Sequence, residues 1–283
     1  MSRVTQPAAA ARPRGYAAPV PKRRLDTLLA ERGLFHSRAR AAAAVLAGEV
    51  RLGPDRRRAQ KPGQLIADDV ALAVDERPAF VSRGGIKLAN ALDSLGVEVE
   101  GRRCLDVGAS TGGFTDCLLQ RGAAGVVALD VAYGALHWTL RRDPRVTVLE
   151  RRNARRLDPG ELPWAPELVV ADVSFISLTK VLPAALGGAA ARFDCLALVK
   201  PQFELGRELV GKRGVVRSAE DRRAALVGVG AFVRDRLGLA VLGYAPSGLP
   251  GPAGNRESFV WVAEPGRTGA VADLGEAARR AEP

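Results

Sequence analysis

Five short apolar runs, separated by segments with a helical pattern, constrain the fold of this chain more than any other feature. They occupy residues 104–107, 126–129, 146–149, 168–171 and 195–199. Strands buried on both faces of a parallel sheet are continuous apolar runs, whereas half-exposed strands alternate apolar and polar residues. Strands of this kind alternating with helices predict a doubly wound α/β sheet with right-handed crossovers, which we place in residues 82–265.

Residues 22–81 predict a second, smaller domain of the α+β class. Leucines between residues 25 and 29 recur at helical spacing, and Gly33 can end that helix. Ser37 precedes an alanine-rich run, which is typical of the N-cap of a second helix. Short strands follow, so this part of the chain is expected to form a compact unit of its own.

Positive charge is concentrated at the N-terminal end of the chain. Residues 1–61 contain 14 Lys and Arg against 4 Asp and Glu, whereas residues 62–283 contain 28 against 27. A basic segment joined to a near-neutral domain indicates an enzyme with a module that binds a polyanion such as a nucleic acid. A solubilising tail is the alternative. We expect residues 1–21 to be a disordered basic tail and residues 266–283 to be a weakly structured tail.

Several protein classes are disfavoured by what the sequence lacks. No run approaches the roughly 18 apolar residues of a membrane helix, and the first residues have no apolar stretch of a secretory signal. Three widely spaced cysteines argue against a disulfide framework and for a reducing compartment. Two histidines, with no cysteine–histidine cluster, argue against a zinc site. We therefore expect a cytoplasmic monomer with no metal and no membrane association.

A glycine-rich loop follows the first apolar run, between Asp106 and Phe114. Glycines there let the backbone approach a ligand, and ligands of such sheets bind at the carboxyl ends of the strands. Asp130 ends the next strand, where an acid can bind both hydroxyls of an adenosine ribose. The spacing G-x-x-x-G-G departs from the dinucleotide pattern G-x-G-x-x-G. S-adenosylmethionine, whose amino group a carboxylate such as Asp106 can attract, is therefore favoured over a nicotinamide cofactor or a turn without ligand.

Four charged residues stand beside predicted strands. Lys87 precedes the first strand, Asp172 and Lys200 end the fourth and fifth, and Glu257 precedes the last. Each alone could be a member of a surface ion pair. Because strand-end residues of a doubly wound sheet converge on one edge, we interpret the four as one catalytic set.

Such a set suits methyl transfer to a ribose 2′-hydroxyl, which is a poor nucleophile until it loses its proton. A neutral lysine can accept that proton beside a second cation, and two carboxylates can hold both lysines. Methylation of base amino groups is disfavoured because the loop after the fourth strand reads Asp172-Val173-Ser174-Phe175 rather than Asn/Asp-Pro-Pro-aromatic. Methylation of a pyrimidine carbon needs a thiolate, and Cys195 lies inside an apolar strand.

The N-terminal domain resembles the RNA-binding domain first described in small-subunit ribosomal protein four. The resemblance is carried by residues 24–26, 32–34, 37–38 and 48–50. It implies that Arg24, Arg38 and Arg40 contact RNA phosphates, which positions a protein without specifying sequence. A generic helical hairpin with a solvated basic face is the alternative interpretation.

The chain from residue 22 to about residue 263 resembles the TlyA family of ribosomal RNA 2′-O-methyltransferases, whose catalytic domain is related to FtsJ. The stretches that carry the resemblance are 82–88, 106–114, 172–177, 200–204 and 254–257. The resemblance implies a Rossmann-like methyltransferase sheet, cytidine as the methylated nucleoside, and ribosomal RNA or ribosomal subunits as the partner. It also implies that Lys87, Asp172, Lys200 and Glu257 are catalytic.

By the same resemblance, the pocket for S-adenosylmethionine is lined by Gly108, Ser110, Gly112, Asp130 and Asn153. Members of the family have also been called hemolysins, but no segment here is predicted to span a bilayer. The second hypothesis is a non-catalytic RNA-binding factor for ribosome assembly that retains a vestigial methyltransferase fold. The intact lysines and acids argue against it.

Overall fold

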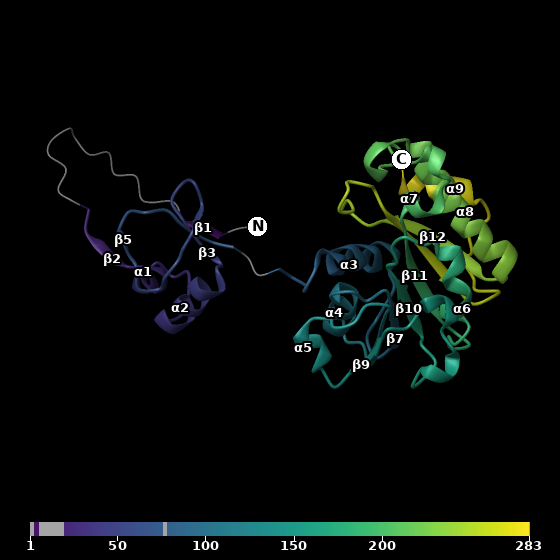
Figure 1. Ribbon diagram of the computed structural model, residues 1–283, viewed down its shortest axis with the longest axis horizontal. Helices are drawn as coiled ribbons and strands as arrows, with labels where there is room; N and C mark the ends of the chain where they lie inside the picture. Colours follow the sequence, from purple (N-terminus) through teal and green to yellow (C-terminus); the bar gives the residue numbers. More distant parts are fainter. Residues whose placement is uncertain (1–2, 6–19, 76–77, 283) are drawn as a thin grey trace. The chain divides into compact units, whose positions relative to one another are not determined.

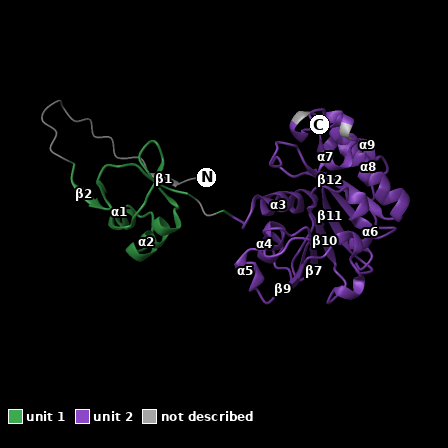
Figure 2. Cartoon of the chain, in the orientation of Figure 1, with its two compact units in different colours: residues 1–78 green, residues 79–283 purple. Residues whose placement is uncertain are grey.

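The computed structural model describes residues 3–5, 20–75 and 78–282. The chain divides into two compact units, residues 1–78 and 79–283 (Figure 2). The domain boundary expected after residue 81 lies a few residues beyond this division. Most of the expected basic tail lies outside the described residues, but Arg3–Thr5 form a strand, β1.

The smaller unit packs two helices against short strands. β1, β6, β3 and β4 form an antiparallel sheet in that order, and β2 pairs with β5. Leu25, Leu29 and Val45 from the helices pack with Val50 and Leu72 from the sheet. The elements are β1 (Arg3–Thr5), β2 (Lys22–Arg24), α1 (Leu25–Glu31), α2 (Arg38–Ala47), β3 (Val50–Leu52), β4 (Arg57–Arg58), β5 (Leu65–Ala67) and β6 (Leu72–Val74).

The predicted N-cap of α2 is confirmed, and a glycine ends the helix. Ser37 Oγ accepts a hydrogen bond from the Arg40 amide at 3.2 Å, as an N-cap side chain does. Gly48 ends the helix with φ +79, a left-handed conformation that glycine adopts without strain. The two caps fix where the exposed arginines at the start of α2 stand.

The larger unit is built on a seven-stranded sheet in the order β12-β13-β11-β10-β7-β8-β9. The five predicted apolar strands are β7 to β11, which are mutually parallel, so the doubly wound α/β sheet is confirmed. β13 is antiparallel to both β11 and β12. The strands are β7 (Arg103–Val107), β8 (Gly125–Asp130), β9 (Val146–Glu150), β10 (Leu168–Ala171), β11 (Asp194–Val199), β12 (Ala240–Pro246) and β13 (Ser258–Ala263).

Helices cover both faces of this sheet: α3 and α4 lie on one face, and α6, α8 and α9 on the other (Figure 1). In β11, Cys195 and Ala197 belong to one core and Leu196 and Leu198 to the other, which explains the unbroken apolar run. The helices are α3 (Arg83–Leu95), α4 (Gly113–Gln120), α5 (Trp138–Arg141), α6 (Leu182–Leu186), α7 (Pro201–Glu204), α8 (Ala219–Leu237) and α9 (Leu274–Ala281). Short 3₁₀ turns are η1 (Ala154–Arg156), η2 (Pro159–Glu161), η3 (Leu178–Lys180), η4 (Arg207–Leu209) and η5 (Lys212–Gly214).

The last residues of the chain differ from the weakly structured tail that we expected. They contain α9, in which Leu274, Ala278 and Ala281 are buried in the core shared with α8. Their spacing of four and three residues places them on one face of the helix. A single leucine and small alanines make this face hard to recognise in the sequence.

The winding of the sheet changes direction between β7 and β10. β8 and β9 follow β7 to one side, whereas β10 and β11 lie on its other side. Ligands of open α/β sheets bind at such a point, outside the carboxyl ends of the strands. Gly108, directly after β7, and Asp172, directly after β10, stand there.

Candidate active site

The glycine-rich loop after β7 is packed closely against its neighbours. Gly108 has φ +85, and a Cβ atom there would lie 2.4 Å from the carbonyl oxygen of Asp172. Gly112 has φ +96 at the start of α4, and a Cβ atom there would lie 2.3 Å from the side chain of Leu140. Glycine is therefore required at both positions, and the loop backbone can form one wall of a ligand site.

A cavity of about 460 Å³ lies beside the ends of β8 and β9, and its volume is typical of a small-molecule site. Gly108, Ser110, Asp130 and Asn153 line it together. Asp130 accepts hydrogen bonds from the amides of Ser110 and Ala132, both at 2.7 Å, which fixes its carboxylate at the strand end. The structure thus brings together four of the predicted cofactor residues.

The other two predicted cofactor residues, Asp106 and Gly112, line neither this cavity nor the adjoining one. Asp106 is fully buried, and its Oδ2 accepts a hydrogen bond from Thr115 at 2.7 Å. Its Oδ1 has no hydrogen-bond partner within the described residues. Burial raises the pKa of this carboxyl to about 7. Oδ1 has a free acceptor position among those residues, but Asp106 lines neither cavity, so its contact with a cofactor's amino group stays a prediction.

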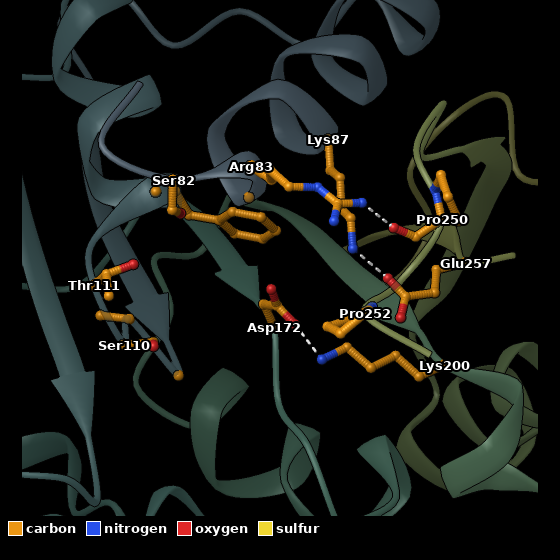
Figure 3. Close-up of a pocket in the computed structure, with 15 residues that line it drawn as sticks. Ser82, Arg83, Lys87, Ser110, Thr111, Asp172, Lys200, Pro250, Pro252 and Glu257 are labelled. Atoms are coloured by element: carbon orange, nitrogen blue, oxygen red, sulfur yellow. Dashed lines mark hydrogen bonds and ion pairs between the residues drawn. The ribbon is translucent and has the colours of Figure 1, made fainter. Parts of the chain in front are cut away.

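The first lysine–carboxylate pair joins α3 to the start of β13 (Figure 3). Lys87 Nζ donates to Glu257 Oε2 at 2.5 Å, although the two residues are 170 positions apart. Their side chains are 8 % and 1 % exposed. The amphipathic helix α3 aims Lys87 toward the sheet with its buried residues Leu88, Ala91 and Leu92. This pair is almost fully buried.

The second pair joins the ends of the adjacent parallel strands β10 and β11 (Figure 3). Lys200 Nζ lies 2.6 Å from Asp172 Oδ1 and donates a hydrogen bond to Ser174 Oγ at 2.8 Å. The Lys200 side chain is 12 % exposed and that of Asp172 is 26 % exposed. This pair is therefore more open to solvent and to a substrate than the first.

All four predicted catalytic side chains line one cavity of about 420 Å³ (Figure 3). Gly108, Ser110 and Asp172 belong to this cavity and to the cavity at β8, so the two adjoin at the glycine-rich loop. A methyl donor in one cavity and an acceptor in the other would meet at that loop.

Sequence reasoning missed several residues of the catalytic cavity. Arg83 lines it and donates a hydrogen bond to the carbonyl of Pro250 at 2.6 Å. The remaining additional lining residues are Ser82, Gly84, Ala109, Thr111, Gly113, Phe114, Pro250 and Pro252. Their motifs, 82–88 and 106–114, were recognised, but no chemistry was assigned to these side chains. The proline loop at residues 250–252 enters the site only through the fold.

The predicted RNA-binding arginines of the smaller unit differ in their contacts. Arg24 and Arg38 both pair with the buried carboxylate of Asp26, at 2.7 and 3.2 Å. The hydrogen bond from Arg24 holds the pKa of Asp26 well below its usual range. Arg40 is exposed, and its side chain has no ion pair within the described residues. RNA binding by these three residues stays a prediction.

Comparison with known proteins identifies the family. A model of the FtsJ-like methyltransferases matches residues 80–264. The 16S/23S rRNA (cytidine-2′-O)-methyltransferase TlyA of Mycobacterium tuberculosis is 51 % identical over 241 residues, covering 84 % of this chain and 89 % of that relative. The chain belongs to the TlyA family of FtsJ-like methyltransferases. It is therefore an enzyme that takes its methyl group from S-adenosylmethionine.

Further proteins are similar to this chain along much of their length. The 23S rRNA (cytidine-2′-O)-methyltransferase TlyA of Campylobacter jejuni is 35 % identical over 64 % of this chain and 70 % of its own. Hemolysin A of Brachyspira hyodysenteriae is 40 % identical over 69 % of this chain and 80 % of its own. A solved Streptococcus thermophilus structure that also carries the name hemolysin has a TM-score of 0.68 and 39 % identity, covering 93 % of this chain and 96 % of that one.

Two further observations concern membrane-spanning helices and metal sites. Within the part of the chain that the structure describes, no helix is both long and apolar enough to cross a membrane. Among the same residues, no group of histidine, cysteine, aspartate and glutamate side chains could hold a metal ion.

Proposed function

We propose that this TlyA-family enzyme methylates the 2′-hydroxyl of a cytidine in ribosomal RNA, on free RNA or on a ribosomal subunit, in the cytoplasm. The observation that carries the proposal is the pair of lysine–carboxylate contacts that line one cavity, Lys87–Glu257 and Lys200–Asp172. The names of the relatives in Mycobacterium tuberculosis and Campylobacter jejuni supply the nucleoside and the RNA.

The residues at β8 and β9 fit the adenosine part of S-adenosylmethionine. We propose that Asp130 binds the ribose hydroxyls while Gly108 and Ser110 approach the cofactor with their backbone. Asn153 would line the same pocket, and the unpartnered Oδ1 of Asp106 would attract the amino group. The bound cofactor supplies an electrophilic methyl group on a positively charged sulfur.

The lysine pairs have distinct roles in this proposal. Lys200, which reaches the cavity from the end of β11, accepts the proton of the 2′-hydroxyl as the oxygen attacks the methyl carbon. Lys200 can accept this proton only as a neutral amine, so the ammonium that pairs with Asp172 must first pass a proton to solvent. Lys87, which is paired with buried Glu257, provides the neighbouring cation.

Alignment of the reacting atoms supplies much of the remaining rate enhancement. A hydroxyl held in line with the methyl carbon and the departing sulfur no longer has to find that arrangement by diffusion. The smaller basic unit would keep the RNA near this site through phosphate contacts, with Arg24, Arg38 and Arg40 as its proposed contacts. Positioning and chemistry are therefore divided between the two units.

Methyl transfer from radiolabelled S-adenosylmethionine to purified small and large ribosomal subunits, and to the free RNAs, tests this function. We expect label in RNA, mapped to a cytidine ribose by its resistance to alkaline cleavage. Lys200→Ala serves as the matched inactive variant. RNA binding without label in any substrate would instead support the non-catalytic assembly factor.

A further inference from the structure

Glu204, the last residue of α7, is a partly buried acid that lines neither of the two cavities. It belongs to the stretch 200–204, which carries part of the family resemblance. Within that stretch, only Lys200 has been given a chemical role. Its carboxylate receives two hydrogen bonds from the segment that follows β10. Ser177 Oγ donates to Oε2 at 2.6 Å, and the Leu178 amide donates to Oε1 at 2.8 Å.

These bonds are one of three contacts between the two strand-end segments 172–178 and 200–204. At the strand ends, Lys200 contacts Asp172 and Ser174. Further along, the rings of Phe175 and Phe203 lie 5.2 Å apart. At the far end, Glu204 holds the first residues of η3. The segment that carries Asp172 is thus fixed at both of its ends.

The middle of segment 172–178 needs such an anchor. Phe175 has φ +63, a left-handed conformation that a bulky residue adopts only when its surroundings impose it. Its side chain is 92 % exposed, so burial of the ring does not hold the backbone there. Contacts on either side of Phe175 must therefore supply the constraint, and the Glu204 carboxylate provides two of them.

An acid at this place carries a cost of its own. Burial raises the pKa of Glu204, while its bonds to Ser177 and Leu178 work in the opposite direction. In this environment either form of the carboxyl group is stable only if its hydrogen bonds compensate for the hydration that it loses. Glu204 uses both oxygens on one segment, and that segment begins at Asp172.

We propose that Glu204 is a positioning residue for methyl transfer: it locks segment 172–178 to the turn that carries Lys200, so that Asp172 and Ser174 meet the Lys200 amine. It touches neither substrate nor cofactor and acts through these three residues. The inference rests on the proposed function, because it assigns the Lys200 pair to the chemical step.

The test compares Glu204→Ala with Glu204→Gln in the full chain, with kcat, the KM for RNA and the melting temperature as readouts. Misplacement of a reacting group by about 1 Å can lower a rate by about 100-fold, so we expect kcat of Glu204→Ala to fall by about 10- to 100-fold with a smaller change in KM. Glutamine can still accept from the Leu178 amide and donate to Ser177, so we expect this variant to recover most of the turnover.

Glu264→Ala is the matched control. Glu264 also accepts a backbone hydrogen bond from a neighbouring segment, at the Phe193 amide, but it follows β13 at the opposite edge of the sheet. We expect Glu264→Ala to lower the melting temperature without lowering kcat below that temperature. Should Glu204→Ala fail to fold, Ser177→Ala removes one of the two bonds and should lower kcat in the same direction.

Hydrogen exchange at the Leu178 amide separates failure of this inference from failure of the proposed function. We expect faster exchange in Glu204→Ala than in the unmodified chain, whatever the substrate. If the unmodified chain modifies no RNA, the proposed function is wrong even when exchange responds. If Glu204→Ala is folded and keeps kcat within about twofold, well below the 100-fold scale of a misplaced group, the positioning role is wrong.

Discussion

The two sides of the catalytic cavity hold the same kind of ion pair in different surroundings. Lys87 and Glu257 are 8 % and 1 % exposed, and they come from elements 170 positions apart in the sequence. Lys200 and Asp172 are 12 % and 26 % exposed, and they end adjacent parallel strands. One pair is largely buried between a helix and the start of an antiparallel strand, whereas the other lies at the more exposed ends of two parallel strands.

This difference assigns different tasks to chemically identical groups. A buried charge without a partner is expensive, so Lys87 and Glu257 hold each other in place and act as a fixed pair. A pair with partial access to water can exchange a proton with a bound hydroxyl and with solvent. In the proposed function, the open pair would therefore carry out the chemical step, and the buried pair would supply a fixed charge.

The largest expected effect is on turnover at the open pair. We expect Lys200→Ala to lower kcat by about 100- to 10,000-fold, the range for loss of a general base. Affinity for S-adenosylmethionine, measured by calorimetry, should stay nearly unchanged, because Lys200 does not line the cavity with Asp130 and Asn153.

Lys200→Arg distinguishes proton transfer from simple attraction by charge. Arginine keeps the positive charge but cannot give up its proton near neutral pH, so it should be nearly as inactive as alanine. Near-normal turnover of Lys200→Arg would leave Lys200 as a positioning charge and remove the functional contrast between the two pairs.

The next effect is on the free energy of unfolding. Here we expect the larger loss at the Lys87–Glu257 pair and the smaller loss at the Lys200–Asp172 pair. Glu257→Gln leaves Lys87 as a buried cation without a charged partner, which typically costs about 3–5 kcal/mol. Asp172→Asn breaks a more exposed pair and should cost about 1 kcal/mol or less. Urea denaturation of both variants measures the two values, and equal losses would show that the pairs are buried alike in solution.

Asp130→Ala provides a benchmark for pure cofactor binding on the other side of the glycine-rich loop. We expect weaker binding of S-adenosylmethionine by about 1–3 kcal/mol, the range for a lost hydrogen bond to a charged group. Because Asp130 does not line the cavity with the two pairs, kcat at saturating cofactor should change little. Titration calorimetry that finds unchanged affinity in a folded variant removes Asp130 from the site.

The sequence predicted those parts of the molecule whose signal is local. Strands β8, β10 and β11 are continuous apolar runs because both of their faces are covered, whereas the edge strand β9 is only partly buried. Asp172 and Lys200 could be assigned to one edge because they directly follow parallel strands. Asp130 was proposed from its position at the end of the second strand, whereas Gly108 and Gly112 were assigned to the cofactor pocket by the family resemblance.

Features that depend on distant pairing could not be predicted in this way. β13 runs antiparallel between β11 and β12, and only this arrangement delivers Glu257 to Lys87. No local sequence pattern predicts that contact. Apart from their positions next to predicted strands, only the family resemblance placed Lys87 and Glu257 in one group. The ion pairs of Asp26 with Arg24 and Arg38 were not predicted for the same reason, since the tertiary structure determines which residues form ion pairs.

Asp106 allows a pH test behind the open pair, since it lies opposite Val170 of β10 in the sheet register. Its pKa of about 7 exceeds the unfolded value near 3.8, so the folded chain holds a proton that the unfolded chain releases. This contribution to stability is full below about pH 4 and is lost as pH rises through 7. We expect Asp106→Asn to remove that loss, measured as the difference in unfolding free energy between the two chains from pH 5.5 to 8.5.

Cofactor binding should respond to the same titration in the opposite sense. If the ionised carboxylate attracts the cofactor's amino group, affinity for S-adenosylmethionine should rise about tenfold from pH 6 to pH 8, following the ionised fraction. Asp106→Asn should flatten this rise. A pH dependence of stability without one of affinity would make Asp106 a core residue that does not face the cofactor.

The smallest expected effect is on RNA binding by the smaller unit, in which one arginine is held in an ion pair and another is not. Arg38 pairs with buried Asp26, whereas the Arg40 side chain has no ion pair within the described residues. An unengaged arginine can neutralise a phosphate, so Arg40→Ala should flatten the logarithmic salt dependence of RNA binding by about 1 and leave stability unchanged. Arg38→Ala should flatten it less and destabilise the fold, because Asp26 loses one of its two cations.

Filter-binding titrations at several salt concentrations provide the slopes. Identical slopes for Arg40→Ala and the unmodified chain would place the RNA elsewhere on the protein, and a larger change for Arg38→Ala would show that its pair with Asp26 opens when RNA binds.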